Sequence, residues 1–520
     1  MDNLQFVQQI YHGKNCYADS MAPEQIDLLH IPSGVEAIVR KMINEKRMVF
    51  LTGNPGDGKT FIIKALSSFL DDVFVVTDMN SIPDSDLPQL AKRINDCYIN
   101  GEPCVIAANE FPFHKLTNVI KLHHPKLYEE LSGIKKNILV LGYPTVELKR
   151  ICIIDLNERN LLDKDRCAVK SFIQKFINLL LPYCGSNHIL AHNVKAFTTD
   201  LALNQVLDIF SFISMSGQHF VIRDILEAVS YMLVSCTDAE RDDEESGYYY
   251  DALFSANNDL MVFASQFDPI LLSKPELDEK LWNGELLEGW QLDCPSRWPA
   301  QIARGNGSVE EATSLFKSVK RKFYFENIYA MGLAELQPRD FRECMEVLVK
   351  MREDTRQIKR MLIYSMNRLF LSTDNEREKL RSWTTHSYDL SRQAGASVSA
   401  RYIDANDLEL AYPEPVKWLN EMEYSPACIV MFSSKRRDIR LEINIDLLRS
   451  LIRIKNGYPP SLLSAQYEQV ISQFVRTLCT ADISRDYPDG EIIIANRREG
   501  ILKTLRIEND KYYLGNGVGF

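Results

Sequence analysis

The residues with the clearest chemical signal form one short segment. GNPGDGKT, from Gly53 to Thr60, matches the pattern G-x-x-x-x-G-K-[ST] at every fixed position. Its glycines let the backbone wrap a phosphate without Cβ clashes, so that successive N–H groups face the phosphate oxygens. Lys59 is placed to neutralise the β- and γ-phosphates of a nucleotide, and Thr60 to give a hydroxyl to Mg²⁺. The predicted cofactors are therefore ATP and Mg²⁺, and the predicted binding residues are Gly53, Asn54, Pro55, Gly56, Asp57, Gly58, Lys59 and Thr60.

Hydrolysis of ATP needs acids as well as a phosphate cradle. One acid has to hold the metal shell, and another has to polarise the attacking water. Three acids end predicted strands: Asp78 in FVVTDMN, Glu110 in CVIAANE and Asp155 in ICIIDLNER. Glu110 lies 51 residues after Lys59, where related ATPase sheets carry these acids, and we predict that it is the catalytic base.

The metal ligands predicted beside Thr60 are Asn109 and Asp78. The usual Asp-Glu pair of such sites reads Asn109-Glu110 here. An Asn can coordinate a metal through its carbonyl oxygen but brings no charge, so we expect weaker metal binding and slow turnover. Loss of hydrolysis altogether, which would leave a nucleotide-gated switch, stays open as an alternative.

One asparagine and three arginines complete the predicted catalytic set. Asn157, just after ICIID, is expected to orient the attacking water. Arg159 and Arg166 follow in a loop, from which a guanidinium could reach the γ-phosphate in the same chain or in a neighbouring subunit. Arg223 opens a lid-like helix in FVIRDILEAV and is expected to sense the γ-phosphate. The alternative for each arginine is an ordinary surface charge or ion pair.

The elements that must position these residues alternate between strand and helix. Apolar runs predict strands over 48–53, 72–78, 103–110, 137–143 and 150–156, and helical patterns cover 61–70, 86–100 and a lead-in over 1–45. Short apolar strands separated by helices imply a parallel sheet covered on both faces. The predicted fold class is an α/β P-loop NTPase with a helical lid, followed by a mostly helical region and a small C-terminal α+β domain.

Four domains follow from these patterns. We predict an NTPase core with its lead-in over 1–165, a helical lid over 166–235, a mainly helical domain with acidic, Trp-containing loops over 236–425, and an α+β domain over 426–520. In the last domain, strands are expected at 427–433, 439–445, 491–496 and 502–508, around a helix over 462–478.

Composition and charge limit the class of protein. The chain has 520 residues, of which 45% are hydrophobic and 25% charged, as in ordinary globular proteins. Residues 236–300 hold 15 acidic and 4 basic residues, so their net charge of −11 equals that of the whole chain. Membrane-spanning apolar runs and a signal peptide are absent from the sequence, and the eleven cysteines lie in apolar surroundings typical of reduced thiols. We therefore expect a cytoplasmic protein without membrane association.

A basic cluster gives a weaker signal for nucleic acid. Lys317, Lys320, Arg321 and Lys322 interleave with aromatic residues in FKSVKRKFYFE. Such a stretch could track a nucleic-acid backbone or the acidic patch of a partner. The alternative is a half-buried helix with a solvated basic edge. Direct contact with DNA thus stays open.

Three of these motifs together resemble a known family. GNPGDGKT, then IAANE, then IIDLNERNLL are similar to the P-loop ATPase subunit, of the DptF type, of bacterial DNA-phosphorothioation-dependent restriction systems. The similarity extends through FDPILLSKPELD, KRKFYFE and INIDLLRSLIRIKNGYPP, and so covers most of the chain. The resemblance implies an AAA+-like ATPase that works beside partner proteins in defence against foreign DNA. It extends to relatives of such ATPases that serve other anti-phage systems.

Two functional interpretations remain open at this point. In the first, ATP hydrolysis remodels or licenses a DNA-acting partner, which the several arginines favour. In the second, ATP binding orders an assembly scaffold and turnover is incidental, which Asn109 favours. In both, the lid leaves the nucleotide at the edge of its domain, where an arginine of a neighbour can complete the site. We therefore expect an ATP-dependent homo-oligomer.

Overall fold

The chain folds into two compact units. The computed structural model describes residues 2–12, 21, 23–141, 150–163, 168–185, 187–214, 218–237, 247–285, 290, 298–305, 307–327, 339–351, 353–384, 396–412, 423, 428–460, 465–496, 499–508 and 511–516. Unit 1 comprises Met1–Ser214, Gln218–Gln337 and Pro415–Ser425. Unit 2 comprises Met215–Gly217, Pro338–Glu414 and Pro426–Phe520.

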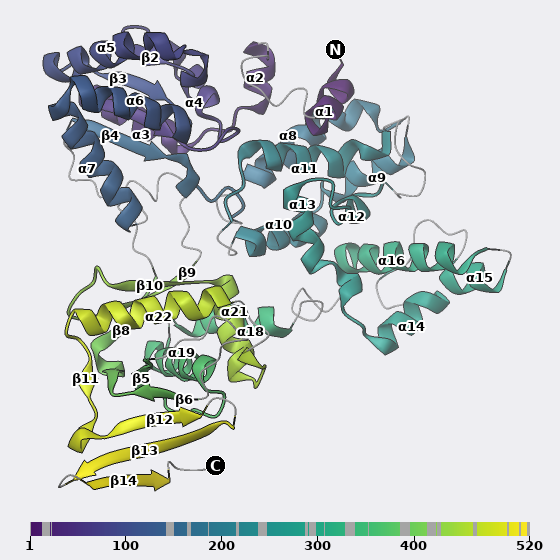
Figure 1. Cartoon of the computed structure of the whole chain (residues 1–520). Helices are drawn as coiled ribbons and strands as arrows, with labels where there is room; N and C mark the ends of the chain where they lie inside the picture. The colour runs from purple at the N-terminus through teal and green to yellow at the C-terminus, as the bar shows by residue number, and fades with distance from the viewer. Residues whose placement is uncertain are drawn as a thin grey trace. The chain divides into compact units, whose positions relative to one another are not determined.

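A four-stranded parallel sheet forms the first part of unit 1 (Figure 1). Its strands are β1 (Met48–Thr52), β2 (Phe74–Val76), β3 (Cys104–Ala107) and β4 (Ile151–Asp155). The strand order is β2-β3-β1-β4, so β3 and β4 flank β1. Because all strands run in the same direction, their carboxyl ends meet at one edge, and Thr52 pairs with Asp155 there.

Helices cover both faces of this sheet, as the near-continuous apolar strands predict. Alternate residues of β1 enter different cores: Met48 and Phe50 pack with α5 (Leu87–Asn100), α6 (Glu110–His123) and α7 (Pro125–Leu141). Val49 and Leu51 pack with α3 (Gly34–Asn44) and α4 (Lys59–Ala65). The predicted three-layer α/β core is confirmed at this level.

The strand predicted over 137–143 is wrong. Helix α7 continues through Leu141, and residues 142–143 lie outside the described residues. The apolar run NILVL extends a helix whose earlier residues Leu127 and Leu131 already face the core. A short apolar run fits a buried strand and a helix segment equally well, and here the helix prevails.

Most of the remaining described helices of unit 1 share one large apolar core. That core joins α1 (Asn3–Tyr11), α2 (Pro23–Leu29), α8 (Ala168–Leu180), α9 (His188–Ala196), α10 (Asp200–Ser214), α11 (Ile222–Val234), α12 (Tyr249–Ala252), α13 (Asp259–Ala264) and the end of α16 (Val309–Glu326). A smaller cluster with Trp290 joins α14 (Pro275–Asn283) to α16, beside α15 (Pro299–Arg304).

The described residues of unit 2 form four helices and antiparallel sheets. Its helices are α18 (Arg339–Met351), α19 (Thr355–Phe370), α21 (Ile445–Lys455) and α22 (Ala465–Thr480). The expected C-terminal strands are present as β9 (Cys428–Ser433), β10 (Arg440–Asn444), β12 (Ile492–Asn496) and β13 (Ile501–Glu508), with β11 (Arg485–Asp486) and β14 (Lys511–Asn516) in addition.

The prediction of a mainly helical chain up to residue 425 needs correction. Four strands precede that point, namely β5 (Lys379–Ser382), β6 (Ala396–Ser399), β7 (Arg401–Asp404) and β8 (Leu408–Ala411). They pair with the later strands in the orders β10-β9-β8, β11-β7-β5 and β14-β13-β12-β6. Each mixes polar with apolar residues, as in KLRS and RYID, unlike the continuous apolar run CVIA of β3. Among the described residues, no helix is long and apolar enough to cross a membrane.

Candidate functional site

The segment Gly53–Thr60, called the glycine loop below, connects β1 to α4 at the carboxyl edge of the sheet. Gly53, Gly56 and Gly58 have φ values of 141°, 100° and 84°, which side chains with a Cβ rarely adopt. A Cβ on Gly58 would also lie 2.7 Å from Cδ1 of Ile222. The loop conformation therefore depends on glycine for both its backbone angles and its close packing.

Lys59 begins α4 and is buried against the loop. Its Nζ donates hydrogen bonds to the carbonyl oxygens of Gly53, at 3.0 Å, and Asn54, at 2.7 Å. Burial lowers the pKa of the Lys59 ammonium, although nearby carboxylates act in the opposite direction. Those carboxylates belong to Asp57, Asp78, Asp155 and Glu110. One ammonium thus lies in the field of four acids, three of which the sequence had placed at strand ends.

A cavity of about 190 Å³ lies beside the glycine loop. Lys59 and Thr60 line it, together with Asp78, Asn109 and Arg223. The structure thus brings both predicted metal ligands and the predicted lid arginine to the loop. Glu110 is exposed at the start of α6, and it does not line this cavity.

Asp155 and Asn157 lie at the end of β4, which flanks β1 on the side opposite β3. Burial raises the pKa of the Asp155 carboxyl, while the backbone N–H of Asn157, 3.1 Å from Oδ1, lowers it. The charges of Glu110 and Asp57 raise it further. The side-chain oxygen Oδ1 of Asn157 is buried and accepts no hydrogen bond from any described residue. It can therefore accept a hydrogen bond from a water or a ligand.

Arg159 is held in place by an ion pair that the sequence did not suggest. Its Nε lies 3.0 Å from Oε2 of Glu423; the Arg159 side chain is buried, and that of Glu423 is half-buried. Nη2 donates to Oγ of Ser33 at 3.2 Å, and Nη1 approaches the carbonyl oxygen of Asp57 at 3.5 Å. This guanidinium supports the glycine loop from outside rather than lining its cavity. Arg166, the other loop arginine, lies outside the described residues.

Helix α11 begins directly on the glycine loop. A Cβ on Gly56 would lie 2.9 Å from Cγ2 of Val221, and Ile222 packs on Gly58. Ahead of them, Nε2 of His219 lies 2.6 Å from Oδ1 of Asp57. Sequence reasoning missed His219 and Glu423, because pairings over 162 and 264 residues leave no local pattern.

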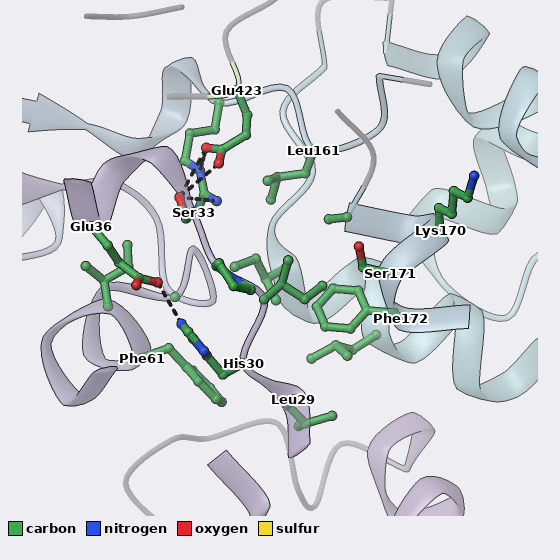
Figure 2. A pocket seen from close by; sticks show the side chains of 18 residues that line it. Leu29, His30, Ser33, Glu36, Phe61, Leu161, Lys170, Ser171, Phe172 and Glu423 are labelled. Atoms are coloured by element: carbon green, nitrogen blue, oxygen red, sulfur yellow. Dashed lines mark hydrogen bonds and ion pairs between the residues drawn. The ribbon is translucent and has the colours of Figure 1, made fainter. Parts of the chain in front are cut away.

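A second cavity, of about 400 Å³, also has Gly58 and Ile222 in its lining. Both residues line both cavities. The second is otherwise lined by apolar side chains, such as Phe61 and Phe172, and by a few polar groups. Figure 2 shows one of these, His30, joined to Glu36 through a contact of 2.7 Å between Nε2 and Oε1.

The basic cluster in α16 is largely neutralised within unit 1. Lys320 Nζ lies 2.7 Å from Asp278, and Lys322 Nζ lies 3.5 Å from Glu326. Arg321 pairs with Asp268 at 2.5 Å and Asp251 at 2.9 Å. Of the four basic residues, only Lys317 is exposed. The alternative of a half-buried helix is therefore confirmed, but its solvated basic edge is reduced to Lys317, and the other three charges pair with acids within unit 1.

Two broader searches add no further site. Among the described residues, no group of three or more His, Cys, Asp or Glu side chains is arranged to hold a metal ion. Comparison with protein-family models, with curated proteins and with solved structures gave no match to this chain.

Proposed function

We propose that the chain is a P-loop NTPase of AAA+-like type that binds ATP and Mg²⁺ through the glycine loop. The observation that carries this proposal is the buried Lys59 at the start of α4. Its Nζ donates hydrogen bonds to the carbonyl oxygens of Gly53 and Asn54. Backbone N–H groups and a lysine at a helix start form an anion site. Asp78 and Asn109 line the same cavity and supply oxygen ligands suited to Mg²⁺.

The second cavity supports the proposal because it can take the nucleobase. Its volume of about 400 Å³ and its mixed apolar and polar lining suit a planar ring system. Phe61 follows Thr60 directly, so a nucleotide whose phosphates contact the loop can extend along α4 into this cavity. His30, held by Glu36, offers a ring nitrogen for hydrogen bonding to the base.

The cellular role is proposed from the sequence resemblance. We infer an ATP-hydrolysing subunit of a bacterial DNA restriction or anti-phage defence complex that licenses or remodels a DNA-acting partner. The second candidate is a nucleotide-gated switch with little turnover. It is favoured by one observation: the uncharged Asn109 lines the cavity, whereas Glu110 does not.

Removing the Lys59 ammonium tests nucleotide binding. We expect Lys59→Ala to lower the affinity for ATP and Mg²⁺ at least about tenfold, since charge-assisted contacts to phosphate are lost. Isothermal titration calorimetry measures the affinity. Lys115→Ala is the control, because Lys115 pairs with Asp84 on the surface of the same unit. Undiminished binding by Lys59→Ala would reject the site.

A further inference from the structure

The glycine loop contains a buried acid of its own. Asp57 is 1% exposed, and its Oδ2 accepts a hydrogen bond of 2.5 Å from the backbone N–H of Asn54. Oδ2 packs so closely on the loop that a Cβ on Gly53 would lie 2.5 Å from it. Oδ1 faces His219 Nε2 at 2.6 Å. The carboxylate therefore fixes the loop from inside and makes one contact with the approach to α11.

This acid opposes the binding of a phosphate. A buried negative charge next to an anion site weakens the site, because burial reduces the screening of the repulsion. A protonated His219 removes that cost, since an imidazolium and a carboxylate in contact are neutral together. Neutral His219 still donates the Nε2–H hydrogen bond to Asp57 but leaves the negative charge in the loop.

We propose that His219 is a positioning residue of the nucleotide site: as an imidazolium it neutralises Asp57 and joins the start of α11 to the glycine loop, so that nucleotide binds most tightly when His219 is charged. The inference rests on the proposed binding of ATP to this loop. It adds a pH-dependent link between the loop and α11, the helix that carries Arg223 to the phosphate cavity.

Several charged groups surround the pair, and Nδ1 of His219 is buried and has no hydrogen-bond partner among the described residues. Besides Asp57, the carboxylates of Asp155 and Asp224 act on His219 electrostatically. Two cations also lie near Asp57: the Lys59 ammonium acts on its carboxylate, and Nη1 of Arg159 lies 3.5 Å from its carbonyl oxygen. Asp224 also accepts the backbone N–H of Val221 at 3.0 Å and so fixes the first turn of α11 next to the pair.

The link is mechanical as well as electrostatic. Val221 packs on Gly56 and Ile222 on Gly58, so α11 and the loop share an apolar contact of four residues. His219 adds the polar contact at its edge. Breaking the pair leaves the apolar contact in place, and the charge effect can therefore be measured separately from packing.

The test compares His219→Gln with a matched control, His192→Gln. His192 is also half-buried, and its Nε2 lies 2.7 Å from the Glu326 carboxylate, in the helical part of unit 1. Binding of ATP with Mg²⁺ is measured by calorimetry at about pH 6 and about pH 8.5, on either side of the range in which histidine changes charge. Ratios of variant to wild type cancel the titration of the nucleotide itself.

We expect His219→Gln to lose about fivefold to tenfold in affinity near pH 6 and less than about twofold near pH 8.5, because glutamine keeps a hydrogen-bond donor but not the charge. His192→Gln should bind like the wild type at both pH values. In an Asp57→Asn background, His219→Gln should cause no further pH-dependent loss. In Asp57→Asn alone, the affinity for ATP should depend less on pH than in the wild type. This variant tests the inference in place of His219→Gln if His219→Gln does not fold.

Three results would overturn the inference. They are an equal loss at both pH values, a loss that persists in the Asp57→Asn background, and an Asp57→Asn variant with the pH dependence of the wild type. A wild-type chain that binds no nucleotide at either pH rejects the proposed function itself. Binding by the wild type without the predicted pH dependence rejects the role of His219 alone.

Discussion

At the scale of single residues, the candidate site places four acidic side chains around one ammonium, that of Lys59. Asp57, Asp78, Asp155 and Glu110 all act on Lys59. A triphosphate adds further negative charge, so binding requires that some carboxylates coordinate a metal and others are neutralised. Asp78 fits the first requirement and the pair of Asp57 with His219 fits the second. The remaining acids, Asp155 and Glu110, are then the candidates for chemistry.

Glu110→Gln distinguishes an enzyme from a switch. We expect this variant to bind ATP like the wild type and to lose turnover by about 100-fold or more, because an amide cannot take the proton of the attacking water. Steady-state phosphate release, with and without DNA, measures turnover. Asp78→Asn and Asp155→Asn should lose less. If either abolishes turnover while Glu110→Gln does not, the base has been assigned to the wrong strand.

The sequence predicts the residues of the loop but not those that support it. Glycines, lysine and threonine are recognisable because their contacts lie within eight consecutive residues. Their supports come from far along the chain: His219 for the side chain of Asp57, and Glu423 for Arg159. Only the folded chain brings these pairs together, and neither partner stands in a pattern of its own.

At the scale of elements, apolar periodicity predicts the sheet and fails at short segments. β1, β3 and β4 are buried runs between helices and were predicted. The end of α7 was assigned to a strand because its apolar run has no polar interruption. β5 to β8 are not expected from the sequence because they mix polar with apolar residues, as in KLRS and RYID, unlike the continuous apolar run CVIA of β3. Their pairing with later strands is set by tertiary contacts.

The start of α3 shows how a distant residue completes an element. Ser33 caps this helix, and Glu423 accepts hydrogen bonds from the Gly34 N–H at 2.9 Å and from Ser33 Oγ at 3.0 Å. The backbone oxygen of Glu423 also accepts from the Asn160 N–H at 2.8 Å. A single residue thus joins α3 to the segment after β4, at the rim of the second cavity.

Glu423→Ala should destabilise this junction strongly. Removing one partner of a buried ion pair leaves the charge of Arg159 uncompensated, at a cost of about 3 to 5 kcal/mol. Asp84→Ala is the control, since its exposed pair with Lys115 should contribute less than about 1 kcal/mol. Thermal denaturation measures the loss, and hydrogen exchange of residues 33–44 localises it to α3. Equal effects of the two variants would show that the Arg159 pair is not a structural support.

At the scale of the whole molecule, the chain passes between the two units several times. The chain leaves unit 2 at Glu414, contributes Pro415–Ser425 to unit 1 and returns to unit 2 at Pro426. Glu423 lies on that crossing and contacts Arg159, which in turn supports the glycine loop. The crossing therefore brings into unit 1 a residue that supports the glycine loop through Arg159. The sequence gives no sign of it, because its domains were divided in chain order.

The state of association is the last prediction. Of the two loop arginines proposed to reach a neighbour, Arg159 is buried in a pair within its own chain. Arg223 lines the cavity of its own chain. The predicted trans role therefore stays with Arg166, which follows β4 in the sequence and lies outside the described residues. An arginine supplied by a neighbouring subunit to a γ-phosphate accelerates hydrolysis by about 1000-fold or more in related reactions.

We expect ATP and Mg²⁺ to convert the chain of 59.8 kDa into a homo-oligomer, because the γ-phosphate would draw the arginine of a neighbour into the site. Light scattering at micromolar protein, with and without nucleotide, measures the mass. Arg166→Ala should keep ATP affinity within about twofold and lose assembly and turnover together, since only the trans contact is removed. Arg93→Ala, which removes an exposed pair with Glu102, is the matched control and should assemble normally. A monomeric mass in both conditions would exclude the trans arginine, and the chain would then act through other proteins alone.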